Sequence, residues 1–251
     1  MDLIEKIRKW KQGTEYLNWG RDIVAAMAKQ QTKRISSGDL IRVLDVGFGG
    51  GSDLLNVKNA LLGRDAVLYG IDSDSARVAQ AFASGIVGVE LDIERARFPF
   101  DDCFFDIVIA NQVLEHAKEI FWILSEISRV LKPAGILIAG VPNLAALHNR
   151  MLLAVGEQPT CIDLLGPHVR GFTKSGFARF VGAENYFRVL EVKGANFYPF
   201  PAQVAQWLSR RLPTLSVGLF FLCLRTDKEG TFIQVLKNRS LETDFFSGAA
   251  V

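Results

Sequence analysis

A cluster of glycines directly after a short apolar stretch is the feature that most constrains this chain. Residues 43–52 read Val-Leu-Asp-Val-Gly-Phe-Gly-Gly-Gly-Ser, so an apolar strand that carries Asp45 runs into a glycine-rich loop. Glycine is needed where the backbone takes positive φ or where a ligand approaches with no Cβ in the way. Ser52 is expected to cap a following helix, whose first amides attract negatively charged ligand groups. The stretch predicts the nucleotide-binding end of an open α/β sheet.

Apolar strands alternate with helical segments over most of the chain. Parallel strands joined by helices form a sheet that is covered on both faces. We therefore predict an α/β fold: a Rossmann-like, doubly wound, mostly parallel seven-stranded sheet with helices on both faces. Its strands are expected at residues 43–46, 66–71, 86–91, 105–110, 136–141, 187–192 and 217–224.

Breaks in this alternation suggest how the chain is organised. The first insertion is interpreted as a wall for a substrate rather than as a separate domain. We expect an N-terminal helical cap at 1–36, a main domain at 37–226 with insertions at about 143–171 and 195–216, and a C-terminal tail at 227–251.

Two helical segments allow more than one interpretation. The N-terminal aromatic residues Tyr16 and Trp19 could lie in a lid over the ligand, but aromatic residues at helical spacing more often pack on a core. In the second insertion, Val204 and Trp207 share one face of a short helix. Such a helix could lie on a membrane surface, but packing on its own domain or on a partner subunit is preferred.

Charge and cysteine content exclude several classes of protein. The 29 basic and 27 acidic residues give a net charge of +2, which leaves no overall electrostatic footprint for nucleic acid, although a local basic patch stays open. Cys103, Cys161 and Cys223 are odd in number and far apart, so they indicate neither a disulfide framework nor a zinc site. No apolar run reaches the roughly 20 residues of a membrane-spanning helix. We expect a cytoplasmic protein with no stable membrane insertion and no bound metal; a homodimer stays open.

Acidic residues at the ends of three predicted strands narrow the choice of nucleotide. Asp45 would repel a pyrophosphate but suits an ammonium group. Asp72 is placed to accept hydrogen bonds from ribose hydroxyls, and Asp92 from an exocyclic amine such as that of adenine. Both could instead cap turns, which is a common use of aspartate. The glycines follow G-x-G-x-G rather than the G-x-G-x-x-G of dinucleotide sites, so a zwitterionic nucleoside is favoured.

These motifs, taken together, resemble class I S-adenosylmethionine-dependent methyltransferases, of the small-molecule kind called type 11 or type 23 methyltransferase domains. The matching stretches are 43–51, 69–72, 98–106, 111–116 and 130–135, in the family's order. The resemblance implies S-adenosyl-L-methionine as the cofactor and S-adenosyl-L-homocysteine as the product. It implies that the cofactor-binding residues are Asp45, Gly47, Gly49 and Gly51 at the methionine end, Asp72 and Ser73 at the ribose, Asp92 and Ile93 at the adenine, and Ala110 and Asn111 beside the sulfonium.

The same resemblance implies in-line transfer of a methyl group, for which the protein mainly aligns donor and acceptor. A hydroxyl acceptor also needs a base, and histidine is the usual choice near neutral pH. His168, in the first insertion, is the general-base candidate, although it could instead hydrogen-bond its own loop. His116, just past the fourth strand, is expected to order its loop, and His148 to have no chemical role.

The acceptor is left open by these motifs. The fourth strand ends without the Asn-Pro-Pro-Tyr-like residues typical of enzymes that methylate adenine bases or glutamine amides. A small-molecule acceptor is therefore favoured, with the hydroxyl of a metabolite, sugar or lipid-linked precursor as the target. Two alternatives remain: a methyltransferase-like protein that binds the nucleoside without catalysis, and a nicotinamide-dependent oxidoreductase, which Asp45 and the glycine spacing disfavour.

Overall fold

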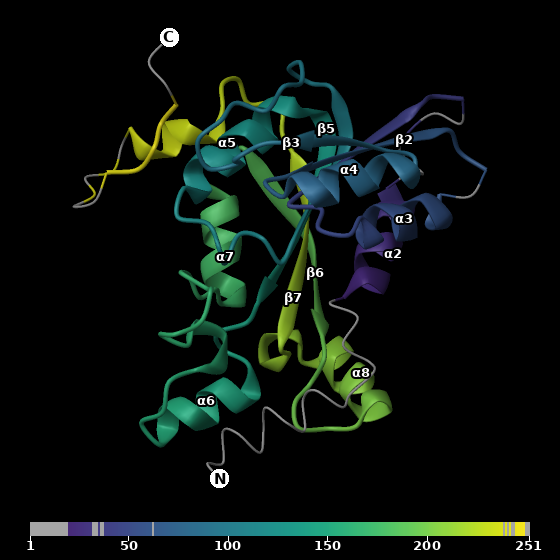
Figure 1. The fold of residues 1–251 in the computed structure, drawn as a ribbon. Helices are drawn as coiled ribbons and strands as arrows, with labels where there is room; N and C mark the ends of the chain where they lie inside the picture. The colour runs from purple at the N-terminus through teal and green to yellow at the C-terminus, as the bar shows by residue number, and fades with distance from the viewer. Residues whose placement is uncertain are drawn as a thin grey trace.

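A single seven-stranded sheet organises the molecule in the computed structural model, which describes residues 20–31, 35, 38–61, 63–237, 239, 241 and 244–248. The strand order is β3-β2-β1-β4-β5-β7-β6 (Figure 1). Strands β1 to β5 pair in parallel, whereas β7 is antiparallel to both β5 and β6. The predicted fold class is confirmed. The strands are β1 Ile41–Val46, β2 Ala66–Asp72, β3 Ile86–Glu90, β4 Phe105–Asn111, β5 Leu131–Pro142, β6 Phe187–Ala195 and β7 Gly218–Arg225.

Helices cover both faces of this sheet. One apolar cluster packs α5 and α7 on one face, and a second packs α2, α3 and α4 on the other. The strands therefore point apolar side chains both ways, as Leu44 and Val43 of β1 do. The helices are α2 Arg21–Gln31, α3 Ser52–Ala60, α4 Ser75–Ala83, α5 Ile120–Val130, α6 Leu147–Ala154, α7 Lys174–Val181 and α8 Ala202–Arg211.

Among the described helices, α4 and α7 begin at residues whose side chains cap them. Asp74 caps α4 by accepting hydrogen bonds from the backbone N–H groups of Ala76 and Arg77. The side chain of Thr173 caps α7 by accepting a hydrogen bond from the backbone N–H of Gly176. The prediction that Ser52 caps α3 is wrong, because the cap position is held by Gly51 at φ 74° and Ser52 is already helical. The first amides of α3 therefore have no side-chain cap and stay available to a ligand.

Most helical structure outside the sheet layers comes from the two predicted insertions. Figure 1 shows α6 and α8 together at one end of the molecule, below the sheet, with β6 and β7 reaching toward them. Helix α8 buries Ala205 and Ser209, while Val204 and Trp207 remain 44% and 58% exposed. These two side chains are therefore not buried against their own domain, and of the two preferred interpretations packing on a partner subunit stays a prediction.

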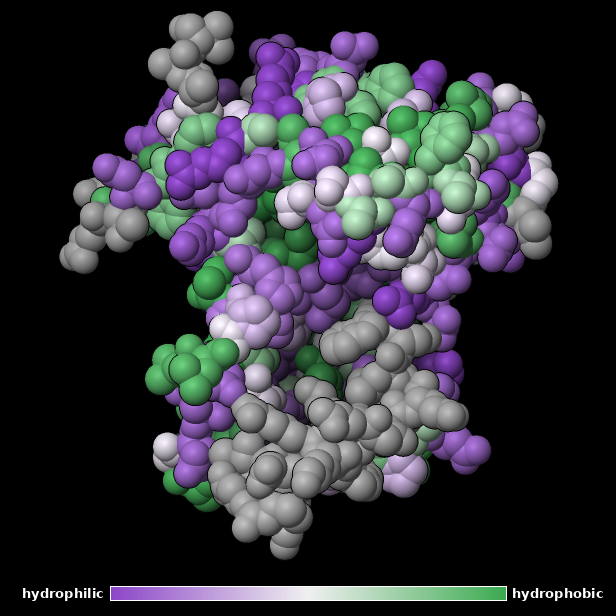
Figure 2. Space-filling view, viewed as in Figure 1, coloured by the Kyte–Doolittle hydropathy of each residue, from purple (hydrophilic) through white to green (hydrophobic). Residues whose placement is uncertain are grey.

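The hydropathy of the visible surface is mixed. Figure 2 shows hydrophilic and hydrophobic residues interspersed over the upper part of this face, where the sheet and its helices lie. None of the helices in the described part of the chain has the length and apolarity that crossing a bilayer requires. The aromatic residues of the predicted N-terminal cap, Tyr16 and Trp19, lie outside the described residues, whereas α2 buries Val24 and Met27.

The end of the chain docks on the start of α5. The ring of Phe245 lies edge-on to Phe121 at 5.0 Å, and that of Phe246 lies edge-on to Trp122 at 5.1 Å. The backbone N–H of Phe246 donates to a carboxylate oxygen of Glu119 at 2.7 Å. Residues 244–248 thus belong to the packed structure, a placement that the sequence pattern did not predict.

Candidate functional site

Two cavities open side by side at the carboxyl ends of the parallel strands. The first, here called the β2-side cavity, measures about 410 Å³ and lies over the ends of β2 and β3. The second, the insertion-side cavity, measures about 420 Å³ and is walled partly by residues 142–168 and 195–196. Gly47, Gln112 and His116 line both. A ligand can therefore extend from one cavity into the other past these three residues.

The predicted cofactor-binding residues divide between the two cavities. The β2-side cavity is lined by Asp72, Ser73, Asp92 and Ile93, and by Gly47. The insertion-side cavity is lined by Gly47, Gly49 and Asn111. The remaining three, Asp45, Gly51 and Ala110, line neither of these cavities.

The glycine-rich loop has the backbone that its sequence predicts. Gly47, Gly49 and Gly51 all have positive φ, at 72°, 55° and 74°. A Cβ on Gly47 would lie 2.7 Å from Cγ2 of Val113, so a side chain does not fit there. The loop therefore needs glycine for two reasons, the positive φ of its backbone and, at Gly47, the close approach of Val113.

Asp72 holds the loop and the next turn in place. Its Oδ2 accepts a hydrogen bond from the backbone N–H of Gly49 at 2.9 Å, and its Oδ1 accepts one from that of Asp74 at 3.0 Å. The guanidinium of Arg77 lies 3.6 Å from Oδ2. Each carboxylate oxygen has more than one lone pair, so Asp72 can also accept from a ligand in the β2-side cavity.

Asp92 caps a turn and also lies in a cavity wall. Its Oδ1 accepts a hydrogen bond from the backbone N–H of Glu94 at 2.9 Å, which is a turn-capping contact. The same residue lines the β2-side cavity. Its use as a cap therefore does not remove it from the ligand site.

Asp45 lies beneath the loop in an acidic environment. It is 2% exposed, and burial raises its pKa well above the usual value. The charges of Asp53 and Asp72 raise that pKa further, whereas Arg21 lowers it. Burial likewise raises the pKa of Asp53, which accepts a hydrogen bond from the side-chain amide of Asn111 at 2.9 Å. A cation bound beside this group would restore the charged form of Asp45.

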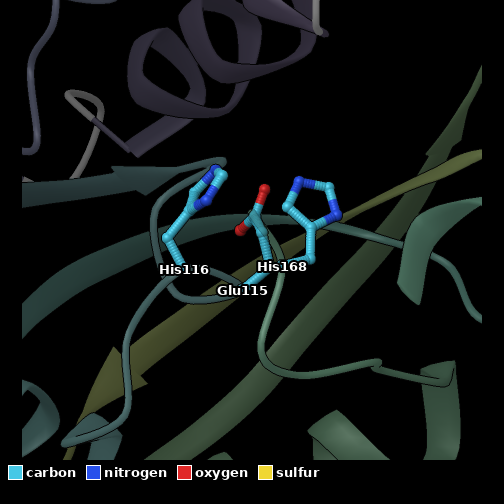
Figure 3. Close-up of side chains that lie close together, drawn as sticks. All are labelled: Glu115, His116 and His168. Atoms are coloured by element: carbon cyan, nitrogen blue, oxygen red, sulfur yellow. The ribbon is translucent and has the colours of Figure 1, made fainter. Parts of the chain in front are cut away.

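Glu115, His116 and His168 form a cluster where the two cavities meet, and Figure 3 shows the carboxylate of Glu115 between the two imidazoles. The ring centroids of His116 and His168 are 4.7 Å apart. Both histidines were predicted from the sequence, but nothing there indicated that they lie side by side.

The insertion reaches this cluster through backbone contacts. The N–H groups of Val169 and Arg170 donate to the backbone oxygen of Glu115 at 2.8 and 3.2 Å. His168 is thereby held against the segment that follows β4. His148, expected to have no chemical role, lies in the same insertion-side cavity, with its Nε2 3.1 Å from the Thr160 hydroxyl.

Glu115 is the functional candidate that sequence reasoning missed. Its side chain is buried, its carboxylate oxygens have no hydrogen-bond partner in the structure, and burial raises its pKa to about 7. Burial, followed by the charge of His168, lowers the pKa of His116. A carboxylate buried without a partner is costly, so this group points to a missing cation or donor. Its position directly before His116 was the available signal.

Several known proteins are similar to this chain in sequence. Residues 44–139 match the family model described as a methyltransferase domain. The ubiquinone biosynthesis O-methyltransferase of Chelativorans sp. (strain BNC1) is 32% identical over 139 residues, which cover 54% of this chain and 51% of that protein. The human mitochondrial ubiquinone biosynthesis O-methyltransferase is 29% identical over 162 residues, covering 61% and 41%. The chain thus spans about half, or less, of the length of the curated relatives it matches.

Solved structures support the fold. An S-adenosylmethionine-dependent methyltransferase from Mesorhizobium loti superposes with a TM-score of 0.55 at 16% identity, covering 83% of this chain and 99% of the other. At this level of identity the likeness concerns the fold alone, and it confirms the doubly wound architecture.

Proposed function

Because residues 44–139 match the model of a methyltransferase domain, we propose that the chain transfers a methyl group from S-adenosyl-L-methionine to a hydroxyl oxygen of a small-molecule acceptor. The products are the methylated acceptor and S-adenosyl-L-homocysteine. The observation that carries the proposal is the pair of adjoining cavities, which provides one compartment for the donor and one for the acceptor.

In this proposal the cofactor occupies the β2-side cavity and extends toward Gly47, Gln112 and His116, which line both cavities. Asp72 accepts hydrogen bonds from the ribose hydroxyls, with Ser73 beside it, and Asp92 and Ile93 meet the adenine; all four line that cavity. Hydrogen bonds to ligand hydroxyls fix the orientation of a bound nucleoside, which the rest of the cavity then encloses.

The methionine end lies along the glycine-rich loop. Gly47 and Gly49 let the backbone approach the ligand, and Asn111 borders the path toward the acceptor. Asp45 pairs with the ammonium group from beneath the loop. Gly51 and Ala110, which line neither cavity, act by fixing the backbone of the loop and of β4.

The acceptor occupies the insertion-side cavity. When bound, the cofactor supplies a methyl group already activated by its sulfonium, so this chain's residues have to align the acceptor and exclude water. The hydroxyl must also lose its proton. The cluster of Glu115, His116 and His168 faces the junction of the cavities, and it is the group that we assign to this step.

Oxygen methylation has one further support. The similar proteins from Chelativorans and from human are named ubiquinone biosynthesis O-methyltransferases. Those names describe the relatives, whose acceptors need not be shared by a chain that spans about half of their length. The proposal includes a cytoplasmic setting, supported by three cysteines that are all free thiols.

Calorimetric titration of the purified protein with S-adenosylmethionine and with S-adenosylhomocysteine tests the first half of the proposal. We expect both to bind at one site in the micromolar range. A folded protein that binds neither ligand but binds a reduced nicotinamide cofactor, detected by its absorbance, would overturn it.

Transfer of a labelled methyl group to a panel of hydroxyl and amine acceptors tests the second half. Labelled product from a hydroxyl compound is the expected result. Cofactor binding without transfer to any acceptor, together with a stoichiometric protein partner, would support the non-catalytic alternative instead.

A further inference from the structure

Three potential metal ligands converge at the junction of the two cavities. Glu115 and His116 follow β4, and His168 comes from the first insertion, far away in the sequence (Figure 3). One ligand atom from each residue lies within 4.8 Å of those of the other two. The spacing of the cysteines did not indicate a metal site. The three ligands of this cluster are a carboxylate and two imidazoles, and only the fold brings them together.

The hydrogen bonds of the two histidines set their tautomers. Nδ1 of His168 lies 2.8 Å from the backbone oxygen of Cys161, and Nδ1 of His116 lies 3.3 Å from that of Pro167. A carbonyl oxygen can only accept, so each Nδ1 carries the proton and each Nε2 keeps its lone pair. An imidazole N–H bonded to a backbone carbonyl is the usual support of a histidine that binds metal through its other nitrogen.

Glu115 supplies the negative charge. Its side chain is 1% exposed, and neither carboxylate oxygen has a hydrogen-bond partner among the described residues. The Glu115 carboxylate and the Nε2 atoms of the two histidines are all hydrogen-bond acceptors, and none of the three can donate to another. Such an arrangement is stable when a cation fills it, because buried polar groups need partners.

We propose that Glu115, His116 and His168 bind one divalent transition-metal ion. Two imidazole nitrogens and one carboxylate suit Mn²⁺, Fe²⁺, Co²⁺ or Zn²⁺ better than the all-oxygen sites of Mg²⁺ or Ca²⁺. Three protein ligands leave coordination positions open toward the cavities, as in metal sites that bind substrate.

The ion gives the cluster its role in the reaction, and this step rests on the proposed function. The acceptor hydroxyl occupies an open position, where the metal lowers its pKa and its proton passes to solvent. The resulting oxygen anion forms a bond to the methyl carbon while the sulfur–carbon bond breaks, and the electron pair of that bond stays on sulfur. The sulfonium becomes a thioether, so no oxidant or further reactant is needed. His168 is then a ligand rather than the base.

The test uses the full chain after treatment with EDTA and measures metal binding without cofactor. Mn²⁺ is titrated by following the electron paramagnetic resonance signal of the free ion, and Zn²⁺ by calorimetry. We expect one site. Glu115→Gln and His168→Gln should each weaken metal binding by on the order of 100-fold. Removing an outer-shell partner of a metal ligand weakens binding by up to about 100-fold, and removing a ligand itself should cost at least as much.

The chain's remaining histidine provides the matched control. His148→Gln changes the same residue type in the same cavity but outside the cluster, so metal affinity should stay within error of the wild type. Absence of a site in the wild-type protein, or equal affinity in the wild type and both cluster variants, overturns the proposal. The wild-type measurement decides the question even if a variant fails to fold.

Titration of each protein with S-adenosylmethionine separates this proposal from the proposed function. Cofactor binding in a protein that binds no metal rejects the metal site alone. Metal binding in a protein that binds no cofactor rejects the proposed function alone. If both hold, removal of the metal should abolish methyl transfer while cofactor affinity is retained, and full turnover without metal would contradict the assigned role.

Discussion

Oδ2 of Asp72 accepts a hydrogen bond from the backbone N–H of Gly49 at 2.9 Å and so ties the end of β2 to the glycine-rich loop. The two residues are far apart in sequence, but the parallel pairing of β1 and β2 brings the ends of both strands to one edge of the sheet. A single carboxylate therefore shapes the loop and also faces the β2-side cavity.

Replacing Asp72 by alanine should weaken binding of S-adenosylmethionine by about 1–3 kcal/mol, the usual loss when a buried partner of a hydrogen bond is removed. Calorimetry measures this change. Asp74→Ala is the control: it removes the cap of α4, which costs about 1 kcal/mol of stability, but Asp74 does not line the cavity. Unchanged affinity in Asp72→Ala would reject the ribose assignment.

Replacement by alanine should affect the stability of the protein very differently at two glycines of the loop. Gly47 has a φ of 72° and no room for a Cβ, whereas a Cβ on Gly50 would meet nothing within 4 Å and Gly50 does not have positive φ. We expect Gly47→Ala to lower the free energy of unfolding by about 1–3 kcal/mol, as strained backbone does, and Gly50→Ala by much less. Urea denaturation of both variants compares them, and equal losses would contradict the structure.

The buried Asp45 should make the stability of the ligand-free protein depend on pH. Because its pKa is raised in the folded state, the folded protein binds more protons than the unfolded one between the two pKa values. Stability therefore falls as pH rises from the unfolded value of about 3.9 through the folded value. Asp45→Asn should flatten this part of the curve, and thermal unfolding across the pH range measures it.

Binding of the cofactor should show the opposite dependence. In the proposed complex the ammonium group pairs with the ionised form of Asp45, so we expect affinity for S-adenosylmethionine to rise over the interval in which ligand-free stability falls. Asp53 titrates in the same direction, so the informative quantity is the difference between wild type and Asp45→Asn. Calorimetry that gives the same affinity for both proteins at every pH would rule out the ammonium contact.

A buried ion pair on α5 should be essential for stability. Arg129 pairs with Glu126 at 2.6 Å and donates to the backbone oxygens of Phe98 and Phe100. Arg129→Met leaves the Glu126 carboxylate buried without its partner, and we expect a loss of about 3–5 kcal/mol. Arg97→Met is the control, since Arg97 is 67% exposed and a surface pair contributes about 0–1 kcal/mol. Guanidinium denaturation distinguishes the two; similar losses would contradict the burial of the Glu126–Arg129 pair.

The sheet could be predicted because its strands are apolar runs of strand length, each ended by a turn or an acid. The least accurate boundary is that of β5, which begins at Leu131 directly after α5 rather than at Ile136. There Ala134 takes a φ of 65°, a conformation that usually needs glycine, so the local sequence did not indicate it. Tertiary pairing with β4 overrides the local preference.

The candidate site was only partly predictable, for a physical reason. The acids at the ends of β2 and β3 could be placed because the ends of parallel strands meet at one edge. The contact between His116 and His168 depends on how the first insertion folds back, and no periodic pattern describes that path. The docking of Phe246 on Trp122 was missed for the same reason, because a ring contact and one hydrogen bond to Glu119 join segments that are far apart in the sequence.

The walls of the two cavities come largely from different parts of the chain, which has a consequence for how substrate preference can evolve. The β2-side cavity is built by the strand ends and the turns that follow them, whereas much of the insertion-side wall comes from residues 142–168 and 195–196. Under the proposed function, substitutions in those two segments at positions other than His168 change the acceptor preference and leave the residues around the donor unchanged. The architecture thus allows one cofactor-binding domain to act on different substrates through changes in two segments of the chain.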